Sequence, residues 1–295
     1  MTSLLRKVKS RLFLRSRRPA LHQLDGQYSS HARSRGTDFD DLREYAHGDD
    51  VRDIDWKATA RSTTVLLRRY HPERRHVVTF VVNTGRSMAA VTQQRELKAD
   101  VAMAAIGSLA YLATKHGDDV ALMYNGATSV ERIKPGRTDA HLERVLRAVQ
   151  DNSSLTAPAS DFAALVTTAA SSLRHRGIVV CVSDEAPVPS ATAATLRVLG
   201  ARHDLLWIRI GDATFGERTD ARNGVVDIDS GWSVPEFVLA EPRLERATAE
   251  ARKAERDRAN MLLASLGVAS VDVQGDSEVL PGLVELLGAH GARRG

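Results

Sequence analysis

Two hydrophobic patterns alternate along most of this chain. Short runs that are apolar at nearly every position, HVVTFVV at 76–82 and GIVVCVS at 177–183, are rich in β-branched residues, which is typical of strands buried on both faces of a sheet. A longer stretch at 93–115 carries apolar residues every three or four positions, which predicts an amphipathic helix. The other predicted strands are 119–125, 128–133, 204–210, 224–229 and 268–273, and the other predicted helices are 139–149, 161–174, 192–199, 241–267 and 278–287.

This alternation of strands and helices predicts an α/β fold with a doubly wound, mostly parallel sheet. We expect residues 76–290 to form that domain, residues 20–75 to form a small charged segment, and residues 1–19 to be a basic tail. Partners of such sheets bind where loops meet at the carboxyl ends of the strands. The loops expected to face a partner are 83–88, with Arg86 exposed, 151–160, and 184–190, with Glu185 exposed.

The positive charge of the chain is concentrated near its N-terminus. Residues 1–18 contain seven Lys and Arg residues and no acid, so the remaining residues hold more acids than bases. Leu4, Leu5, Val8 and Leu12 recur near helical spacing. The segment is therefore either a basic amphipathic helix that docks on an anionic membrane surface, or a frayed and solvated tail. Nucleic acid is not an expected partner, because the rest of the chain has no basic stripe interleaved with aromatic residues.

Cysteine content and hydropathy indicate the compartment. The single Cys181 excludes an intramolecular disulfide and fits a reducing environment. Its position between valines indicates a small buried side chain rather than a nucleophile. No apolar run reaches the length of about 18 residues that crosses a bilayer, and the start lacks a signal-peptide core. We therefore expect a cytoplasmic protein.

The polar turn NTGRSM after the strand at 76–82 resembles the metal-ion-dependent adhesion site of von Willebrand factor A domains. That site begins D-x-S-x-S and adds a Thr and an Asp from later loops, since Mg²⁺ prefers a set of hard oxygen ligands. The resemblance gives Asn83, Ser87, Ser160 and Asp184 as the candidate metal ligands. Asn83 replaces the leading Asp, Gly85 replaces the first Ser, and Arg86 adds a positive charge. We therefore expect no cofactor, and Mg²⁺ binding that is weak at most.

Residues 33–61 combine eight acids and six bases with one Trp. This density of both charges fits a partly buried network of ion pairs that fixes one shape. It also fits a helix face with exposed ion pairs.

The same segment closely resembles the signature of a bacterial family, domain of unknown function 58. The matching blocks are RGTDF at 35–39, REY at 43–45, GDDVRDIDW at 48–56 and AR at 60–61, with Asp38 in place of the usual Glu. The candidate signature or interaction residues are Arg43, Gly48, Asp49, Asp50, Arg52, Asp55, Trp56 and Arg61.

This resemblance implies a non-enzymatic role. Members of the family are commonly encoded beside MoxR-type AAA+ ATPases, and the pair is thought to assemble or activate other protein complexes. Many members also have transmembrane helices, which this sequence lacks. The resemblance therefore implies an adaptor that binds a MoxR-type ATPase and other proteins. The alternatives are a membrane-surface scaffold docked by residues 1–18, or a hydrolytic enzyme.

Motifs for catalysis are missing from the sequence. It contains no G-x-S-x-G elbow, and its ten His residues do not occur in an H-E-x-x-H spacing. Asp49 and Asp50 form a pair of carboxyl groups, but ion pairing with Arg43 and Arg52 would lower their pKa values and make them poor general acids. We therefore expect no enzymatic activity.

Overall fold

The computed structural model describes residues 3–14, 21–29, 42–46, 49–51, 54–62, 64–68, 76–159, 161–185, 190–213, 225–228, 231–234 and 242–292. The chain divides into two compact units. Residues 1–28 and 76–295 form the first, which we call the α/β unit, and residues 29–75 form the second, the signature unit. The two N-terminal helical segments thus belong to the α/β unit, although the sequence placed residues 1–19 in a tail and residues from 20 onward in the charged segment.

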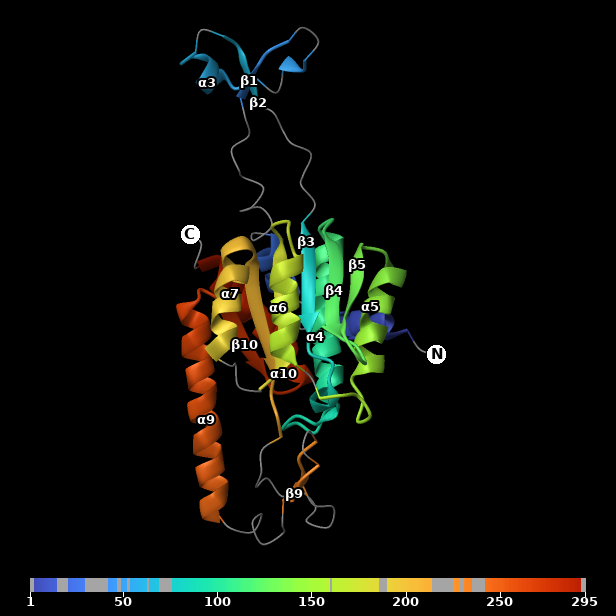
Figure 1. Ribbon diagram of the computed structural model, residues 1–295. Coiled ribbons are helices and arrows are strands. Elements are labelled where there is room, and N and C mark those ends of the chain that lie inside the picture. Colours follow the sequence, from blue (N-terminus) through green and yellow to red (C-terminus); the bar gives the residue numbers. More distant parts are fainter. Residues whose placement is uncertain are drawn as a thin grey trace. The chain divides into compact units, whose positions relative to one another are not determined.

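The α/β unit is built on a six-stranded sheet with the strand order β10-β7-β6-β3-β4-β5 (Figure 1). All neighbouring strands are parallel except β5, which pairs antiparallel with β4. This arrangement confirms the predicted α/β class and the mostly parallel sheet. The strands are β3 (Val77–Val82), β4 (Asp119–Asn125), β5 (Val130–Gly136), β6 (Ile178–Asp184), β7 (Asp204–Ile210) and β10 (Ala269–Val273).

One predicted strand, at 224–229, is not part of this sheet. Its described residues, 225–228, contribute β8 (Val225–Val226), which pairs antiparallel with β9 (Ser233–Val234) in a separate two-stranded sheet. The two apolar residues are followed at once by Asp227, so the run is too short to be buried on both faces. Val226 is accordingly exposed.

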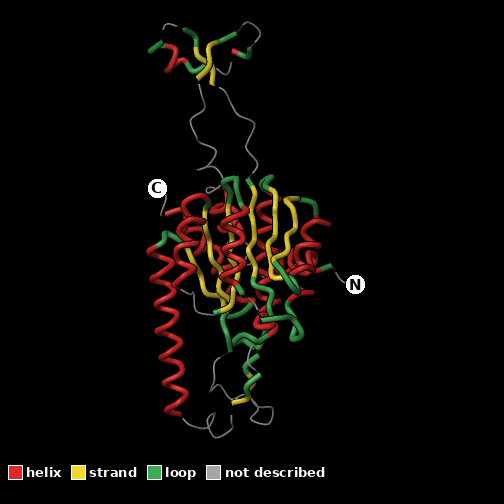
Figure 2. The backbone as a smooth tube through the Cα atoms, in the orientation of Figure 1, coloured by secondary structure: helices red, strands yellow, loops and turns green. Residues whose placement is uncertain are grey.

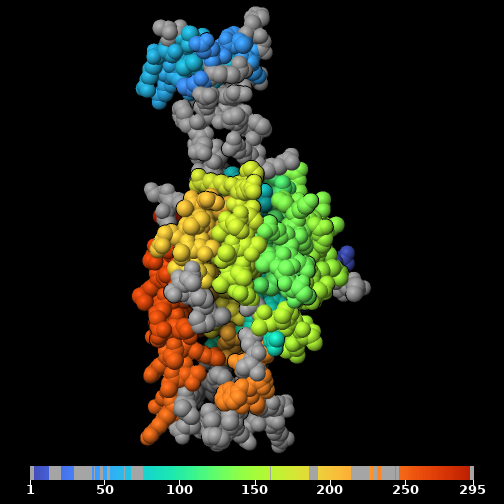
Figure 3. All heavy atoms as spheres, viewed as in Figure 1, coloured from blue at the N-terminus to red at the C-terminus, as the bar shows by residue number. Residues whose placement is uncertain are grey.

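Helices cover both faces of the six-stranded sheet (Figure 2). On one face, Phe80 and Val82 pack in a large cluster with α4 (Lys98–Lys115), α5 (Asp139–Asn152) and α10 (Asp276–Ala292). The opposite face carries a second cluster that includes Val81 and Trp207. Figure 3 shows the helices over this second face, which are α6 (Phe162–Ser172), α7 (Ser190–Arg202) and α9 (Pro242–Ser265). None of the helices in the described parts of the chain is both long and apolar enough to cross a membrane.

The basic N-terminal segment forms α1 (Leu4–Leu14), which packs against α4 and α5. Its apolar side chains Leu5, Val8 and Leu12 are buried in the larger core cluster. Lys9 pairs with Asp139 at 2.7 Å, and Arg11 pairs with Asp276 at 2.9 Å. The helical spacing read from the sequence is therefore present, but the face proposed for a membrane is packed inside the protein. Insertion of this face into lipid would require α1 to leave its own domain.

Glu143 of α5 fixes the first turn of α1. Its carboxylate accepts hydrogen bonds from the Leu4 and Leu5 amides at 3.1 and 2.9 Å and from the Ser3 hydroxyl at 2.8 Å. Burial alone would raise the pKa of Glu143, but these hydrogen bonds, together with nearby Arg147, lower the pKa below its ordinary value. The carboxylate therefore supplies acceptors to the amides at the start of α1, which lack partners within that helix.

Replacing Glu143 with Gln should loosen α1. We expect a loss of about 1–2 kcal/mol of free energy of unfolding, because a neutral amide offers fewer and weaker acceptors. Hydrogen exchange of the α1 amides should speed up, and Glu255→Gln on the exposed side of α9 is the matched control. The lowered pKa of Glu143 makes this stabilisation complete above about pH 4.3 and lost as pH falls through the folded-state value. Wild type and variant should therefore converge in acid, and unchanged exchange of α1 at pH 7 would contradict the role of Glu143.

Candidate functional site

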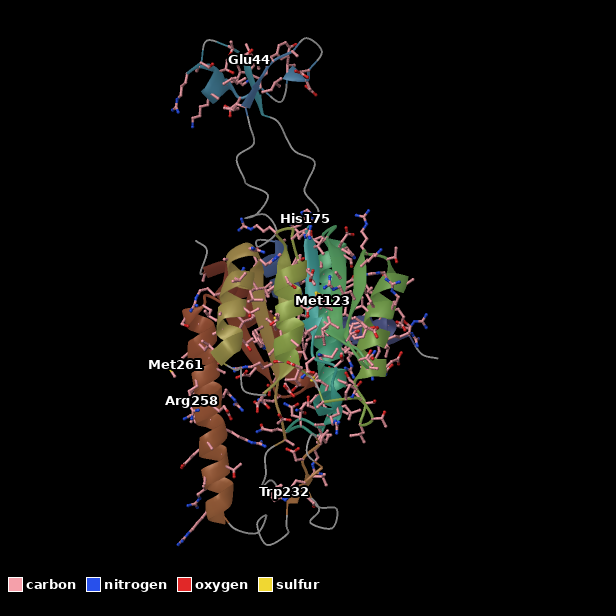
Figure 4. The ribbon with its side chains drawn as sticks, viewed as in Figure 1. Glu44, Met123, His175, Trp232, Arg258 and Met261 are labelled. Carbon is pink, nitrogen blue, oxygen red and sulfur yellow. The ribbon has the colours of Figure 1, made fainter. Side chains whose placement is uncertain are left out.

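The signature unit contains a short antiparallel β-ladder. Its strands β1 (Leu42–Glu44) and β2 (Leu66–Arg68) pair antiparallel, with Arg43 opposite Leu67. Ile54 forms an antiparallel bridge with the same Leu67, and the Leu67 side chain is buried. Glu44 in β1 is labelled in Figure 4.

The Asp-Trp pair of the signature starts a one-turn helix, α3 (Trp56–Thr59). Asp55 is buried and is the N-cap, since its side chain accepts the amides of Lys57 and Ala58 at 3.0 Å each. The Asp55 amide donates to the Leu66 carbonyl at 2.9 Å, and the Thr59 hydroxyl accepts the Leu66 amide at 3.0 Å. Asp55 is thus buried because its side chain caps backbone amides of α3. Its own amide, bonded to the Leu66 carbonyl, joins α3 to β2.

Trp56 lies on the outside of this turn, with 68% of its surface exposed. The sequence placed it at the centre of the charged segment as part of a candidate buried network, but the structure exposes it to solvent. Tyr45, Val51 and Val65 of the same unit are also exposed, and the Tyr45 amide donates to the Val65 carbonyl at 2.9 Å. This small unit therefore carries several large apolar side chains on its surface.

The other signature residues that the structure describes differ in their contacts and exposure. Asp49 accepts the Ala46 amide at 2.9 Å, while Asp50 and Arg61 are exposed. Arg43 lies in β1. Gly48 and Arg52 are outside the described residues.

The predicted metal ligands meet in part at the carboxyl edge of the six-stranded sheet. β3 and β6 are parallel neighbours, and the Asn83 amide donates to the Val182 carbonyl at 2.8 Å. Asn83 and Ser87 therefore lie at the same edge as Asp184, the last residue of β6. Ser160 is outside the described residues. His175 lies at the amino end of the sheet, and Trp232 lies in the β8–β9 hairpin beyond its carboxyl end (Figure 4).

Asn83 and Ser87 make hydrogen bonds to each other and to the backbone. The Asn83 side-chain oxygen accepts the Gly85 amide at 3.0 Å, and its nitrogen lies 3.5 Å from the Ser87 hydroxyl. Both side chains are buried.

Sequence reasoning missed the charged pair at this edge. Lys98, the first residue of α4, is buried, and its ammonium pairs with Asp212, which follows β7. Burial raises the pKa of Asp212, and the nearby carboxylates of Asp184 and Glu185 raise it further, while Lys98 opposes them. In the sequence Lys98 is one of several polar residues within the helix predicted at 93–115. The one feature of the sequence that could have indicated the burial of Lys98 is the apolar stretch that follows it.

Further cations neutralise the acids beside this pair. Glu185 was expected to be exposed, but its side chain is only 16% exposed and pairs with Arg256 at 2.7 Å. Arg209 of β7 pairs with Asp272 of β10 at 2.6 Å. Arg86, also expected to be exposed, is half-buried. Among the described residues, ion pairs therefore link the ends of β6, β7 and β10 with α4 and α9.

Asn83 and Ser87, two of the expected metal ligands at this edge, are already engaged with each other and with the backbone. Asn83 is neutral and its oxygen already accepts an amide, and the ammonium of Lys98 supplies the positive charge beside the acids. Within the described residues, His, Cys, Asp and Glu side chains do not form a group of three or more that could hold a metal ion. A divalent cation prefers charged oxygen ligands. The nearby carboxylates of Asp212 and Glu185 are already paired with Lys98 and Arg256.

Two solved structures resemble this chain over most of its length. One is an aerotolerance-related membrane protein from Bacteroides fragilis NCTC 9343, with a TM-score of 0.41 and 12% identity, covering 72% of this chain and 98% of that chain. The other is a von Willebrand factor type A protein from Catenulispora acidiphila, with a TM-score of 0.39 and 11% identity, covering 72% and 42%. Neither match assigns a ligand or a partner to this chain.

The family relationship rests on the sequence. The uncharacterized protein Rv1480 of Mycobacterium tuberculosis is 30% identical over 265 residues, which is 88% of this chain and 81% of that protein. The uncharacterized protein Mb1516 of Mycobacterium bovis matches with the same identity and coverage. The family described as protein of unknown function DUF58 matches residues 41–257. The chain therefore belongs to the DUF58 family.

Proposed function

We propose that this protein is a non-enzymatic adaptor whose signature unit binds a MoxR-type AAA+ ATPase, and whose α/β unit engages the complex to be assembled or activated. The observation that carries this proposal is the exposure of Trp56 on a capped helical turn. The resemblance of the signature to its family supplies the class of partner.

An exposed Trp on a rigid element suits an interface. Trp is enriched among the residues that dominate binding energy, because it buries a large area and loses little conformational freedom. The cap from Asp55 and the bond from the Leu66 amide to Thr59 hold the turn that presents Trp56 before any partner arrives. Such preorganisation lowers the entropic cost of association. Exposed Val51, Tyr45 and Val65 extend the apolar area of the unit.

Three side chains that catalysis could use, those of Cys181, Asp55 and Asp212, have structural roles. Burial raises the pKa of the Cys181 thiol, which leaves it protonated and a weak nucleophile. Asp55 caps α3, and Asp212 pairs with Lys98. These roles support a binding protein rather than a hydrolytic enzyme.

Replacing Trp56 with Ala should weaken the complex with a MoxR-type ATPase. We expect an increase in Kd of about 30-fold, the effect of losing about 2 kcal/mol at an interface anchor. Biolayer interferometry with both purified proteins would measure it. The matched control is Trp232→Ala, because Trp232 is 58% exposed but belongs to the α/β unit.

Both variants should keep the thermal unfolding temperature of the wild type, since both side chains are largely exposed. Asp50→Ala should weaken the complex less than Trp56→Ala does. Equal affinities of the wild type and Trp56→Ala for the ATPase would contradict the proposal that the signature unit is the binding surface.

A further inference from the structure

Arg86 lies at the carboxyl edge of the main sheet, at the start of η2 (Arg86–Ala89), a turn of 3-10 helix that follows β3. Arg86 is half-buried, and its Nε is buried without a hydrogen-bond partner. Lys98, Arg209 and Arg256 at the same edge each pair with an acid. Arg86 differs from them, because its guanidinium has no counter-charge within the described residues.

The loop between α5 and α6 holds the Arg86 backbone in place. The Arg86 amide donates to the Pro158 carbonyl at 3.1 Å. Asn125, the last residue of β4, contacts the same loop, since its side-chain nitrogen donates to the Asp161 carbonyl at 3.3 Å. The Asn125 carbonyl accepts the Thr84 hydroxyl at 2.7 Å. Arg86 and Asn125 therefore belong to one cluster of loops that follow β3 and β4 and precede α6.

The acids nearest to this loop cluster do not neutralise Arg86. Asp161 caps α6, where its side chain accepts the Ala164 amide at 2.8 Å. Asp184 is buried at the end of β6, and it forms no ion pair with Arg86. Residues 152–159 carry no charged side chain. A cation that is partly removed from water without a counter-charge is unfavourable, so an anion that reached the guanidinium would be stabilised.

The free groups of Arg86 and Asn125 indicate which anion fits. A guanidinium binds a carboxylate through two parallel hydrogen bonds. The Asn125 side-chain oxygen is buried and has no hydrogen-bond partner, so it can accept an N–H group. A polypeptide offers both, because a side-chain carboxylate is flanked by backbone amides, whereas a free inorganic anion has no N–H. Leu155, which is 68% exposed in the adjoining loop, adds an apolar contact.

We propose that Arg86 and Asn125 form a binding site for an Asp or Glu side chain of a partner protein. The guanidinium takes the carboxylate, and the Asn125 oxygen takes a backbone N–H of the same partner. This site deepens the role of the α/β unit in the proposed function and rests on it, since the partner belongs to the complex that this unit engages. Because a guanidinium supplies the positive charge, the interaction does not require a divalent cation.

NMR of the full chain with isotope-labelled arginine tests the proposal. The probe is acetyl-aspartate N-methylamide, and its neutral control is acetyl-asparagine N-methylamide. At about pH 6 the probe carboxylate is ionised. The probe should shift the Arg86 Nε–H signal with a Kd on the order of 10 mM, the affinity of about one charge-assisted pair. The neutral control should leave this signal in place, and EDTA should not change the response to the probe.

Variants locate the binding to Arg86. Arg86→Gln should lose the Nε–H signal and the probe-induced shifts of the Thr84 and Gly85 amides. Arg86→Lys keeps the charge but not the planar fork, and it should weaken binding about threefold. The matched control is Arg174→Gln, because Arg174 is exposed between α6 and β6 at the other end of the sheet. It should keep the Kd within about twofold.

A further variant separates this site from the proposed ATPase contact. Trp56→Ala removes the proposed anchor for the ATPase and should bind the probe with the wild-type Kd. A failure of the ATPase contact would therefore leave the carboxylate site intact, and the reverse also holds.

Four results would overturn the proposal. The first is an equal shift of the Arg86 signal by the neutral control. The second is persistence of the Thr84 and Gly85 shifts in Arg86→Gln. The third is an equal Kd at the Nε–H signal of Arg174, which would show that the probe binds any exposed guanidinium. The fourth is tighter binding of acetylglycine, which would assign the site to a chain terminus instead of an acidic side chain.

Discussion

Replacing Asp212 with Asn should lower the free energy of unfolding by about 3 kcal/mol, because it leaves a buried ammonium without its counter-charge. The Lys98 side chain is 2% exposed, whereas that of Asp212 is 34% exposed. Water can therefore solvate Asp212 but not Lys98. Urea denaturation at pH 7.5 would measure the loss.

The opposite change, Lys98→Met, should cost less, about 1–2 kcal/mol. It leaves Asp212 beside Asp184 and Glu185 with no ammonium between them, although Asp212 still contacts solvent. Because the pKa of Asp212 is raised, its favourable contribution is complete below the ordinary value of about 3.9 and is lost as pH rises through the folded-state value. The deficit of Lys98→Met should therefore be smaller at pH 5 than at pH 7.5.

The double variant Lys98→Met with Asp212→Asn gives the decisive comparison. It should recover most of the loss and lie within about 1 kcal/mol of wild type, since removing both charges removes the buried unpaired ion. Asp139→Asn is the control for a surface pair, because Asp139 binds Lys9 with a side chain that is 74% exposed. It should cost about 0.5 kcal/mol. A loss below that control for Asp212→Asn would show that Lys98 does not depend on Asp212.

The central strands of the main sheet were predictable because they are buried on both faces. β3, β6 and β7 therefore read as continuous apolar runs, and each matches its predicted range to within one residue. Residues 224–229 misled the same reasoning, because two valines in a short peripheral hairpin carry the same local signal as the start of a core strand. The helical spacing of residues 4–12 was equally visible, but spacing alone does not say whether the apolar face packs on lipid or on α4.

The candidate sites were harder to predict, because they depend on distant contacts. Lys98 is polar in the sequence and becomes buried only because Asp212, far along the chain, supplies its counter-charge. Glu185 sits in a predicted loop, yet Arg256 of a later helix covers it. Asp55 illustrates a missed local signal, since an Asp directly before a short helix is a common cap. The exposure of Trp56 had no such signal, because the charges around it fitted either a buried or a solvated segment.

Replacing Trp207 with Ala should lower the free energy of unfolding by about 3–5 kcal/mol, because it opens a large cavity in the second core cluster. Trp207 is 1% exposed, packs edge-on against Phe162 with ring centroids 5.3 Å apart, and donates its indole N–H to the Ser183 hydroxyl at 3.0 Å. Trp207→Phe should cost less, about 1–2 kcal/mol, since an aromatic ring remains and the Ser183 hydroxyl still donates to the Asp184 carbonyl at 2.9 Å.

Circular dichroism during urea denaturation would measure these losses, with Trp56→Ala as the control for a Trp that is largely exposed. The wild-type fluorescence provides an independent readout, because Trp207 is buried while Trp56 and Trp232 are exposed. Wild-type emission should shift to the red on unfolding, and the shift should be much smaller in Trp207→Ala. A loss below about 1 kcal/mol in Trp207→Ala would contradict the packing of β7. The hydrogen bond from the Trp207 indole to Ser183 holds the end of β6. Trp207→Phe should therefore speed hydrogen exchange at Asp184 and Glu185 before it affects the centre of the sheet.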